Sequence, residues 1–143
     1  MSDSDERGTY TLVVELAEAA TIELGALGER AFDAGWYAYT GSAFGPGGFA
    51  RVDRHREVAA GERDVRHWHI DYLLGHPATS VEWVVRTAGE DIECAVSQRL
   101  DGERVAAFGA SDCDCPSHLV YSPTDPRKAV RGAHRAAGAG AEE

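Results

Sequence analysis

Short runs of β-branched and aromatic residues, separated by glycine, set the pattern of the first half of the chain. The segment Tyr-Thr-Leu-Val-Val-Glu-Leu at residues 10–16 is typical of a strand, and Trp-Tyr-Ala-Tyr-Thr at residues 36–40 places aromatic side chains on both faces of another. Between them, Gly25 and Gly28 interrupt the pattern, which indicates a small hairpin. Strands are predicted at residues 10–16, 21–24, 30–32, 36–40, 80–87 and 118–121.

Apolar residues recur at helical spacing in three other segments. Residues 66–75 pair Trp68 with Tyr72 and Ile70 with Leu74, four positions apart. Helices are predicted at residues 49–60, 66–75 and 91–100. Strands and helices are mixed without a regular strand–helix–strand alternation, so we expect an α+β domain with a mainly antiparallel central sheet flanked by helices.

The length of 143 residues indicates one domain with a core of its own. Residues 1–7 are acidic and polar, and we expect a disordered tail there. The domain is expected to span residues 8–122. Residues 123–143 lose apolar periodicity and are rich in alanine and glycine, which predicts a flexible C-terminal tail.

The charge balance is strongly acidic, with 24 acidic against 14 basic residues and a formal net charge of -10. Lys128 is the only lysine. Many carboxylates with arginine in place of lysine indicate adaptation to high salt, as in a halophilic archaeon, because concentrated salt screens carboxylate repulsion. An acidic mesophilic protein from a GC-rich genome is the alternative. Either way, the charge argues against a general nucleic-acid coat protein but allows a small cleft lined by arginine.

The chain has no run of about 18 apolar residues, so no transmembrane helix is expected. Its first residues lack the basic and apolar regions of a secretory signal. Cys94, Cys113 and Cys115 make an odd number of cysteines. We therefore expect a cytoplasmic, mostly reduced protein.

One segment gathers residues that suit chemistry. Tyr39-Thr40-Gly41-Ser42-Ala43 reads as the end of a strand, and a loop rich in glycine and proline follows it. Arg51 and His55 come next, four positions apart on one face of a predicted helix. A tyrosine, an arginine and a histidine facing one small volume suit phosphodiester chemistry better than simple packing.

The order of four motifs resembles the GIY-YIG nuclease superfamily: Gly8-Thr9-Tyr10, Tyr39-Thr40-Gly41, Arg51 with His55, and Glu93. A closer resemblance, over about residues 8–122, is to the DUF123 family within that superfamily, some members of which are fused to an endonuclease III-type DNA glycosylase. Because the two tripeptides are farther apart here than in the nuclease pattern, we expect an inserted hairpin at about residues 21–34. The other matching motifs are 37–43, 67–74, Glu93-Cys94, 109–113 and 117–119.

The resemblance implies a role for each site residue. Glu93 would hold one Mg²⁺ or Mn²⁺ ion, and Arg51 would contact the phosphate. Tyr10 or Tyr39 would move a proton, with His55 as its partner. Nucleic-acid contacts are implied for Gly41, Ser42, Arg51 and Arg54. The function implied is a metal-dependent endonuclease acting on DNA, in repair, and the alternative is a non-catalytic nucleic-acid- or protein-binding module that keeps the fold.

A second group of residues is open to several interpretations. Cys94, Cys113, Cys115 and His118 could form a tetrahedral Zn²⁺ site, which would make the protein a zinc-stabilised structural domain. Zn²⁺ is less favoured, because Cys113 and Cys115 are only two apart. The alternatives are a loop that lines the same cleft as Glu93, or cysteines that are small buried residues. The remaining members of this group are His67, His69, Ser111 and Asp112.

Overall fold

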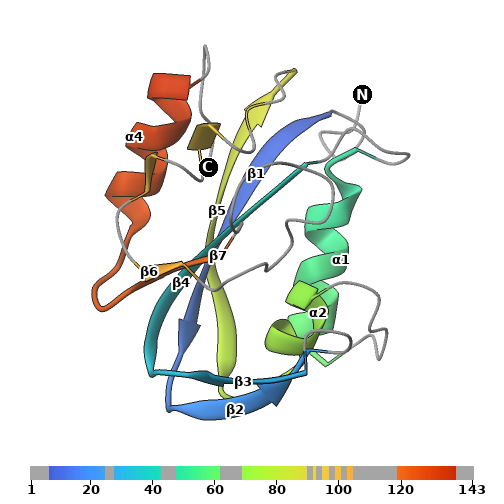
Figure 1. Ribbon diagram of the computed structural model, residues 1–143. Coiled ribbons are helices and arrows are strands. Elements are labelled where there is room, and N and C mark those ends of the chain that lie inside the picture. The colour runs from blue at the N-terminus through green and yellow to red at the C-terminus, as the bar shows by residue number, and fades with distance from the viewer. Residues whose placement is uncertain are drawn as a thin grey trace.

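The computed structural model describes residues 7–24, 28–42, 48–61, 69–89, 92, 95–96, 99–100, 103–104 and 119–137. Across these residues, strands and helices alternate irregularly along the chain (Figure 1). The strands are β1 (Gly8–Leu16), β2 (Ala20–Glu23), β3 (Glu29–Phe32), β4 (Gly35–Ser42), β5 (Thr79–Ala88), β6 (Glu103–Arg104) and β7 (Leu119–Ser122). The helices are α1 (Ala50–Ala59), α2 (His69–Leu74) and α4 (Arg127–Ala137).

The strands in the described ranges form a five-stranded sheet of order β5-β1-β4-β7-β6, together with a two-stranded β2–β3 hairpin. Every neighbouring pair is antiparallel. The first strand therefore lies between β4 and β5, and Tyr10 has Gly41 and Arg86 as its two register partners. These findings confirm the predicted α+β class and the mainly antiparallel central sheet.

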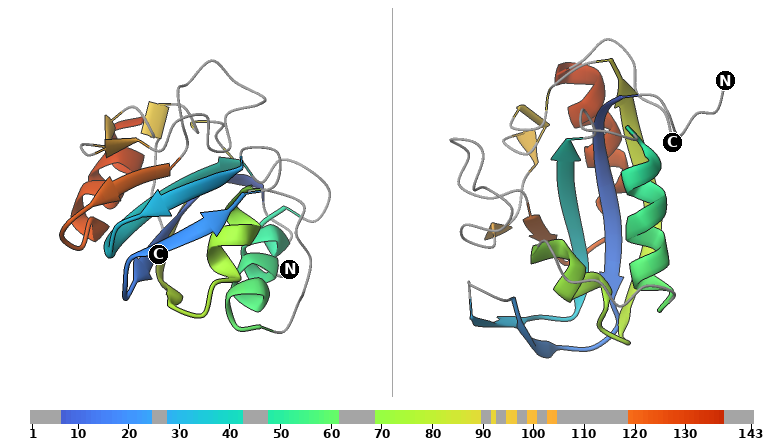
Figure 2. Two further views of the ribbon diagram at one scale, coloured as in Figure 1. Left: turned by 60° about the horizontal axis from the view of Figure 1, so that its bottom comes forward. Right: turned by 90° about the vertical axis from the view of Figure 1, so that its right-hand side faces the viewer.

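Alternation along β1 divides its side chains between two cores. Tyr10, Leu12 and Val14 pack in a cluster with residues of α1 and α2. Val13 packs instead in a second cluster with Val130 of α4. Figure 2 shows α4 and the α1–α2 pair on opposite sides of the sheet. The period of two along a strand thus builds two separate layers from one sequence segment.

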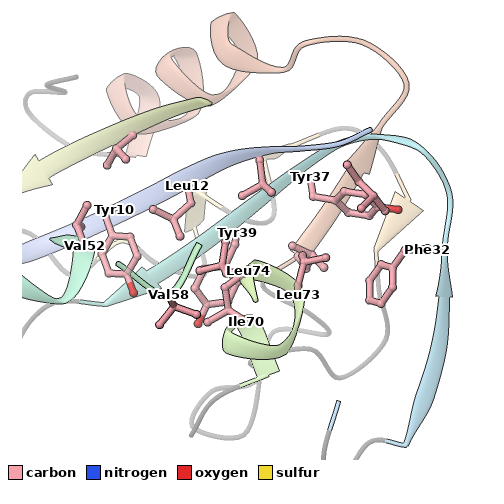
Figure 3. Close-up of a cluster of buried hydrophobic side chains, with 14 of the residues drawn as sticks. Tyr10, Leu12, Phe32, Tyr37, Tyr39, Val52, Val58, Ile70, Leu73 and Leu74 are labelled. Atoms are coloured by element: carbon pink, nitrogen blue, oxygen red, sulfur yellow. The ribbon is translucent and has the colours of Figure 1, made fainter. Parts of the chain in front are cut away.

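The larger core is dominated by aromatic and branched side chains. Figure 3 shows Tyr10 and Tyr39 extending from β1 and β4 toward the side chains of α1 and α2. The labelled helical residues in this view are Val52, Val58, Ile70, Leu73 and Leu74. All of them are buried, so the helices cover this face of the sheet tightly.

The hairpin extends the first core beyond the sheet. Ile22, Leu24 and Phe32 are buried in the same cluster as Tyr10. The Tyr37 hydroxyl donates a hydrogen bond to the Asp33 carbonyl, 2.7 Å away, where the hairpin joins β4. The expected hairpin at residues 21–34 is thus present as the β2–β3 pair.

The predicted helices can be compared with the described ones segment by segment. The predicted helix at 49–60 is confirmed as α1, and residues 69–74 of the segment 66–75, the part that the structure describes as helical, form α2. In the segment 91–100 the described residues include a helical hydrogen bond from the Val96 backbone N–H to the Ile92 carbonyl, 2.9 Å long. The short strand β6 was not predicted.

The expectation of a flexible tail from residue 123 onward is wrong for the helix α4. Val130, Ala133 and His134 are buried on the sheet. The Asp125 carboxylate accepts a hydrogen bond from the Arg127 backbone N–H at the start of the helix. Its apolar contact consists of few, small residues, so it left no clear periodicity in the sequence, and the sheet beneath it stabilises the helix instead.

Candidate functional site

Tyr10 of β1 and His55 of α1 form a direct hydrogen bond at the centre of the first layer. The Tyr10 hydroxyl lies 2.7 Å from His55 Nε2. Tyr39 completes the group, with its ring centre 6.5 Å from that of Tyr10 and 6.1 Å from that of His55. The structure therefore brings together three residues that the sequence separates by 29 and 16 positions.

Gly41 leaves the space that the Tyr10 hydroxyl occupies. The two residues are paired across β1 and β4, and a Cβ atom added at Gly41 would lie 2.6 Å from the Tyr10 hydroxyl oxygen. Such a distance is far below van der Waals contact, so a side chain here would displace the phenol. The glycine of the Tyr39-Thr40-Gly41 motif thus allows the Tyr10 phenol to occupy this position, and its Cα lies against the candidate site.

Burial keeps His55 neutral. Its side chain is 0% exposed, and desolvation by burial lowers its pKa from 6.5 to about 4. The nearby carboxylate of Asp71 acts to raise this pKa, while Arg54 and Arg51 act to lower it further. At neutral pH the ring therefore has one nitrogen that donates and one that accepts a hydrogen bond.

Arg54 connects α1 to α2 through a bidentate ion pair. Its two terminal nitrogens donate to the two Asp71 carboxylate oxygens at 3.1 and 2.9 Å. Asp71 is fully buried and the Arg54 side chain is 16% exposed. The sequence motifs assigned Arg54 to nucleic-acid contact, whereas the guanidinium faces a partner inside the protein and fixes the orientation of the helix that holds His55.

Arg86 is a candidate that the sequence motifs did not identify. It is the β5 register partner of Tyr10, so the two side chains emerge on the same face of the sheet. The Arg86 guanidinium carbon lies 5.4 Å from the centre of the Phe49 ring, at the start of α1. Because side chains alternate along a strand, the sequence of residues 80–87 predicts that Arg86 and Val84 share one face. Only the pairing of β5 with β1 shows that Arg86 lies beside Tyr10.

Arg51 lies one helical turn before His55 and is half-buried. Its charge is close enough to His55 to lower that pKa. Arg51 and Arg86 both belong to the end of the layer where α1 begins. Two guanidinium groups at this end of the layer can contact phosphate oxygens, whose geometry suits the planar fork of arginine.

The predicted metal-binding residues lie outside the described ranges. Glu93, His67 and the group Cys94, Ser111, Asp112, Cys113, Cys115 and His118 fall in segments for which the structure gives no description. The backbone of His69 starts α2 and that of Ser42 ends β4. Among the residues that are described, no three His, Cys, Asp or Glu side chains gather in a way that could hold a metal ion.

The described neighbours of Glu93 belong to the other layer. Ile92 and Val96 pack in the cluster beneath α4. The Ile92 backbone N–H donates to the Thr9 hydroxyl, 3.0 Å away, one residue before Tyr10. This contact ties residue 92 to the same end of β1 that carries the candidate site.

A second buried histidine lies on the opposite face of the sheet. His134 of α4 bonds through Nε2 to the Thr11 hydroxyl and through Nδ1 to the Thr87 hydroxyl, each at 2.8 Å. The Thr11 hydroxyl is also 2.9 Å from that of Thr40. Burial lowers the pKa of His134 to about 4. The network joins α4 to three strands, and no sequence motif identified it.

The family model described as domain of unknown function DUF123 matches residues 9–139. The chain belongs to the DUF123 family. Its match extends through α4, which places the helix within the domain rather than beyond it. No curated protein and no solved structure matches this DUF123 chain. Among its described helices, none combines the length and apolar character that a membrane span requires.

Proposed function

We propose that this DUF123 domain is an endonuclease of the GIY-YIG type that hydrolyses phosphodiester bonds in DNA. The observation that carries the proposal is the 2.7 Å hydrogen bond between the Tyr10 hydroxyl and a neutral His55, with Arg51 and Arg86 at the same end of the layer. A phenol bonded to a neutral imidazole and placed near guanidinium groups suits proton transfer beside a phosphate.

The pair can act as a proton relay. With Nε2 of His55 as the acceptor, the Tyr10 O–H donates to it, and the oxygen lone pairs remain able to take a proton from an attacking water. As the water oxygen bonds to phosphorus, its proton passes to Tyr10 and the Tyr10 proton passes to His55. The bond from phosphorus to the leaving oxygen breaks, and the leaving oxygen takes a proton from solvent water. His55 gives its proton back through Tyr10 to the hydroxide that remains, so the pair returns to its starting state.

Arg51 and Arg86 would stabilise the charge that develops on the non-bridging oxygens. Arg54 supports this arrangement indirectly, because its ion pair with Asp71 fixes α1 against α2.

Glu93, which would hold the Mg²⁺ or Mn²⁺ ion, lies outside the described residues, and a bound ion would supply positive charge to the developing phosphoryl oxygens. The prediction from sequence that Glu93 holds Mg²⁺ or Mn²⁺ is tested separately. We expect cleavage to require one of these ions and Glu93→Ala to abolish it. A role in repair, beside a glycosylase of the endonuclease III type, is part of the same proposal and rests on the resemblance alone.

The test is incubation of the full chain with branched, nicked and damaged DNA in Mg²⁺ or Mn²⁺, at low and high salt. We expect Tyr10→Phe to slow cleavage by about 10²- to 10⁴-fold, the usual contribution of a proton-transfer group. Tyr37→Phe is the matched control, because it removes another buried phenol hydroxyl from the same layer, one that bonds to a backbone carbonyl. Equal rates for the two variants would remove Tyr10 from the mechanism.

A second candidate is a non-catalytic nucleic-acid-binding module. It is favoured by the burial of the pair, since Tyr10 is 1% exposed and His55 0% exposed. In this case DNA binds without turnover on any substrate, and Arg51→Ala and Arg86→Ala weaken binding while Tyr10→Phe leaves it unchanged. Absence of cleavage together with this binding pattern would replace the first proposal with the second.

A further inference from the structure

The C-terminal helix α4 concentrates basic residues on one side. At about 100° per residue, Arg127, Lys128, Arg131 and Arg135 fall within an arc of roughly 100° around the helix axis. The buried positions Val130, Ala133 and His134 occupy a different arc. The exposed small residues Ala129, Gly132 and Ala136 lie between the basic and the buried sides.

This basic side, hereafter the α4 basic face (Arg127, Lys128, Arg131 and Arg135), contrasts with the charge of the chain as a whole. The helix carries four of the 14 basic residues and no carboxylate. The other residues therefore include 24 acidic against ten basic side chains. Within the described part of the chain, Lys128 and Arg135 have no carboxylate within ion-pair distance. A compact positive face on so acidic a molecule has the charge that complements a polyanion.

The α4 basic face is held rigidly against the sheet. His134 bonds to hydroxyl groups on β1 and β5. The Arg127 guanidinium carbon lies 3.9 Å from the centre of the Trp83 ring, a cation–π contact with β5. The face is therefore fixed before a ligand arrives, which lowers the entropy cost of binding.

We propose that the α4 basic face binds the phosphate backbone of a nucleic acid, on the side of the sheet opposite to the Tyr10–His55 pair. The row Arg127, Arg131 and Arg135 repeats about every 6 Å along the helix, so it can contact successive phosphates of one strand. The adjacent small residues allow a backbone to approach closely. Membrane attachment does not fit, because the apolar side of α4 is buried on the sheet and no large apolar residue remains to insert.

The test measures binding of a fluorescent DNA duplex by anisotropy, with the full chain and EDTA present, so that it does not depend on cleavage. The variant Lys128→Gln/Arg135→Gln removes two exposed charges of the α4 basic face. Its matched control, Arg30→Gln/Arg99→Gln, removes two charges from other parts of the molecule. Circular dichroism checks that both variants are folded.

We expect the first variant to bind at least about tenfold more weakly at low salt, and the negative slope of log K against log salt to become less steep by about 1.8, or about 0.9 for each lost phosphate contact. The control should change neither quantity by as much. Equal effects of the two variants would show that only net charge matters and would overturn the proposal. Binding to anionic phospholipid vesicles that is lost in the α4 variant, without binding to DNA, would overturn it as well.

Discussion

Among the described residues, each face of the sheet buries one histidine, His55 on one face and His134 on the other, and the two have different surroundings. Burial lowers the pKa of both His55 and His134 to about 4. His134 has a neutral hydroxyl at each ring nitrogen, supplied by Thr11 and Thr87. His55 instead bonds to a phenol and lies near Asp71, Arg54 and Arg51.

This difference shows how equal burial can serve different purposes. A histidine with a hydroxyl at each nitrogen is a crosslink, and its network holds α4 on the sheet. A histidine bonded to a phenol and surrounded by charged groups has a neighbour whose proton it can exchange. The candidate chemistry therefore belongs to the α1–α2 layer, and the α4 layer supplies a rigid support.

The largest effect on stability should come from removing the buried charge next to His55. Asp71→Asn leaves Arg54 without its carboxylate partner, and breaking a buried ion pair in this way costs about 3–5 kcal/mol. On the other face, Thr87→Val leaves His134 Nδ1 without its hydroxyl and should cost only about 1–3 kcal/mol. Urea unfolding of both variants measures the two costs. A larger loss for Thr87→Val would reverse the comparison.

The two histidines should also make stability depend on pH. In the unfolded chain each ring binds a proton near pH 6.5, whereas the folded protein resists protonation until about pH 4. Their contribution is therefore fully present above about pH 6.5 and is lost as the pH falls toward 4. Each histidine adds a slope of up to about 1.4 kcal/mol per pH unit within this window.

Urea unfolding between pH 4 and 7 measures how the free energy of unfolding changes with pH. This dependence should be less steep for His134→Gln and for His55→Gln than for the parent protein. NMR titration of the parent should show both rings neutral at pH 6. The Asp71 carboxylate raises the pKa of His55, so Asp71→Asn should lower that pKa further and leave His134 unchanged. If Asp71→Asn changed the pKa of His134 as much as that of His55, the conclusion that only His55 lies among charged groups would be wrong.

Two glycines, one in each layer, should respond to alanine with effects of opposite sign, and the smallest effect of all is expected for the one on α4. Gly41→Ala places a Cβ against the Tyr10 hydroxyl and should cost about 1–3 kcal/mol through overpacking. Gly132→Ala on α4 meets no atom within 4 Å and should stabilise the helix by about 0.5–1 kcal/mol. Thermal unfolding of both variants compares them. If Gly41→Ala is as stable as the parent protein, the close contact with Tyr10 is not a constraint.

Local pattern was sufficient to predict most of the fold. The strand character of residues 10–16, 36–40 and 80–87 and the helix at 49–60 depend on neighbours within a few positions, and the structure confirms them. The link between Arg51 and His55 also follows from helical spacing. The roles assigned to Glu93 and the cysteine group stay predictions, since these residues lie outside the described ranges.

Other features depend on which segments meet. Arg86 becomes a candidate only because β5 pairs with β1 in a register that places it beside Tyr10, and register is a property of two strands together. The helix α4 is stable because three strands offer it hydroxyl groups and an apolar surface. Its own sequence, with many alanines and few large apolar residues, carries too little of that information.

The amino-acid sequence alone therefore determines the secondary structure of the α1–α2 layer, the α+β class and the spacing of Tyr39, Gly41, Arg51 and His55, because these follow from propensities and periodicities along the chain. Tertiary structure decided that Tyr10 bonds to His55, that Arg54 is paired within the protein and that a basic helix covers the opposite face. Such contacts join residues far apart in the chain, and their energies exist only when both partners are in place.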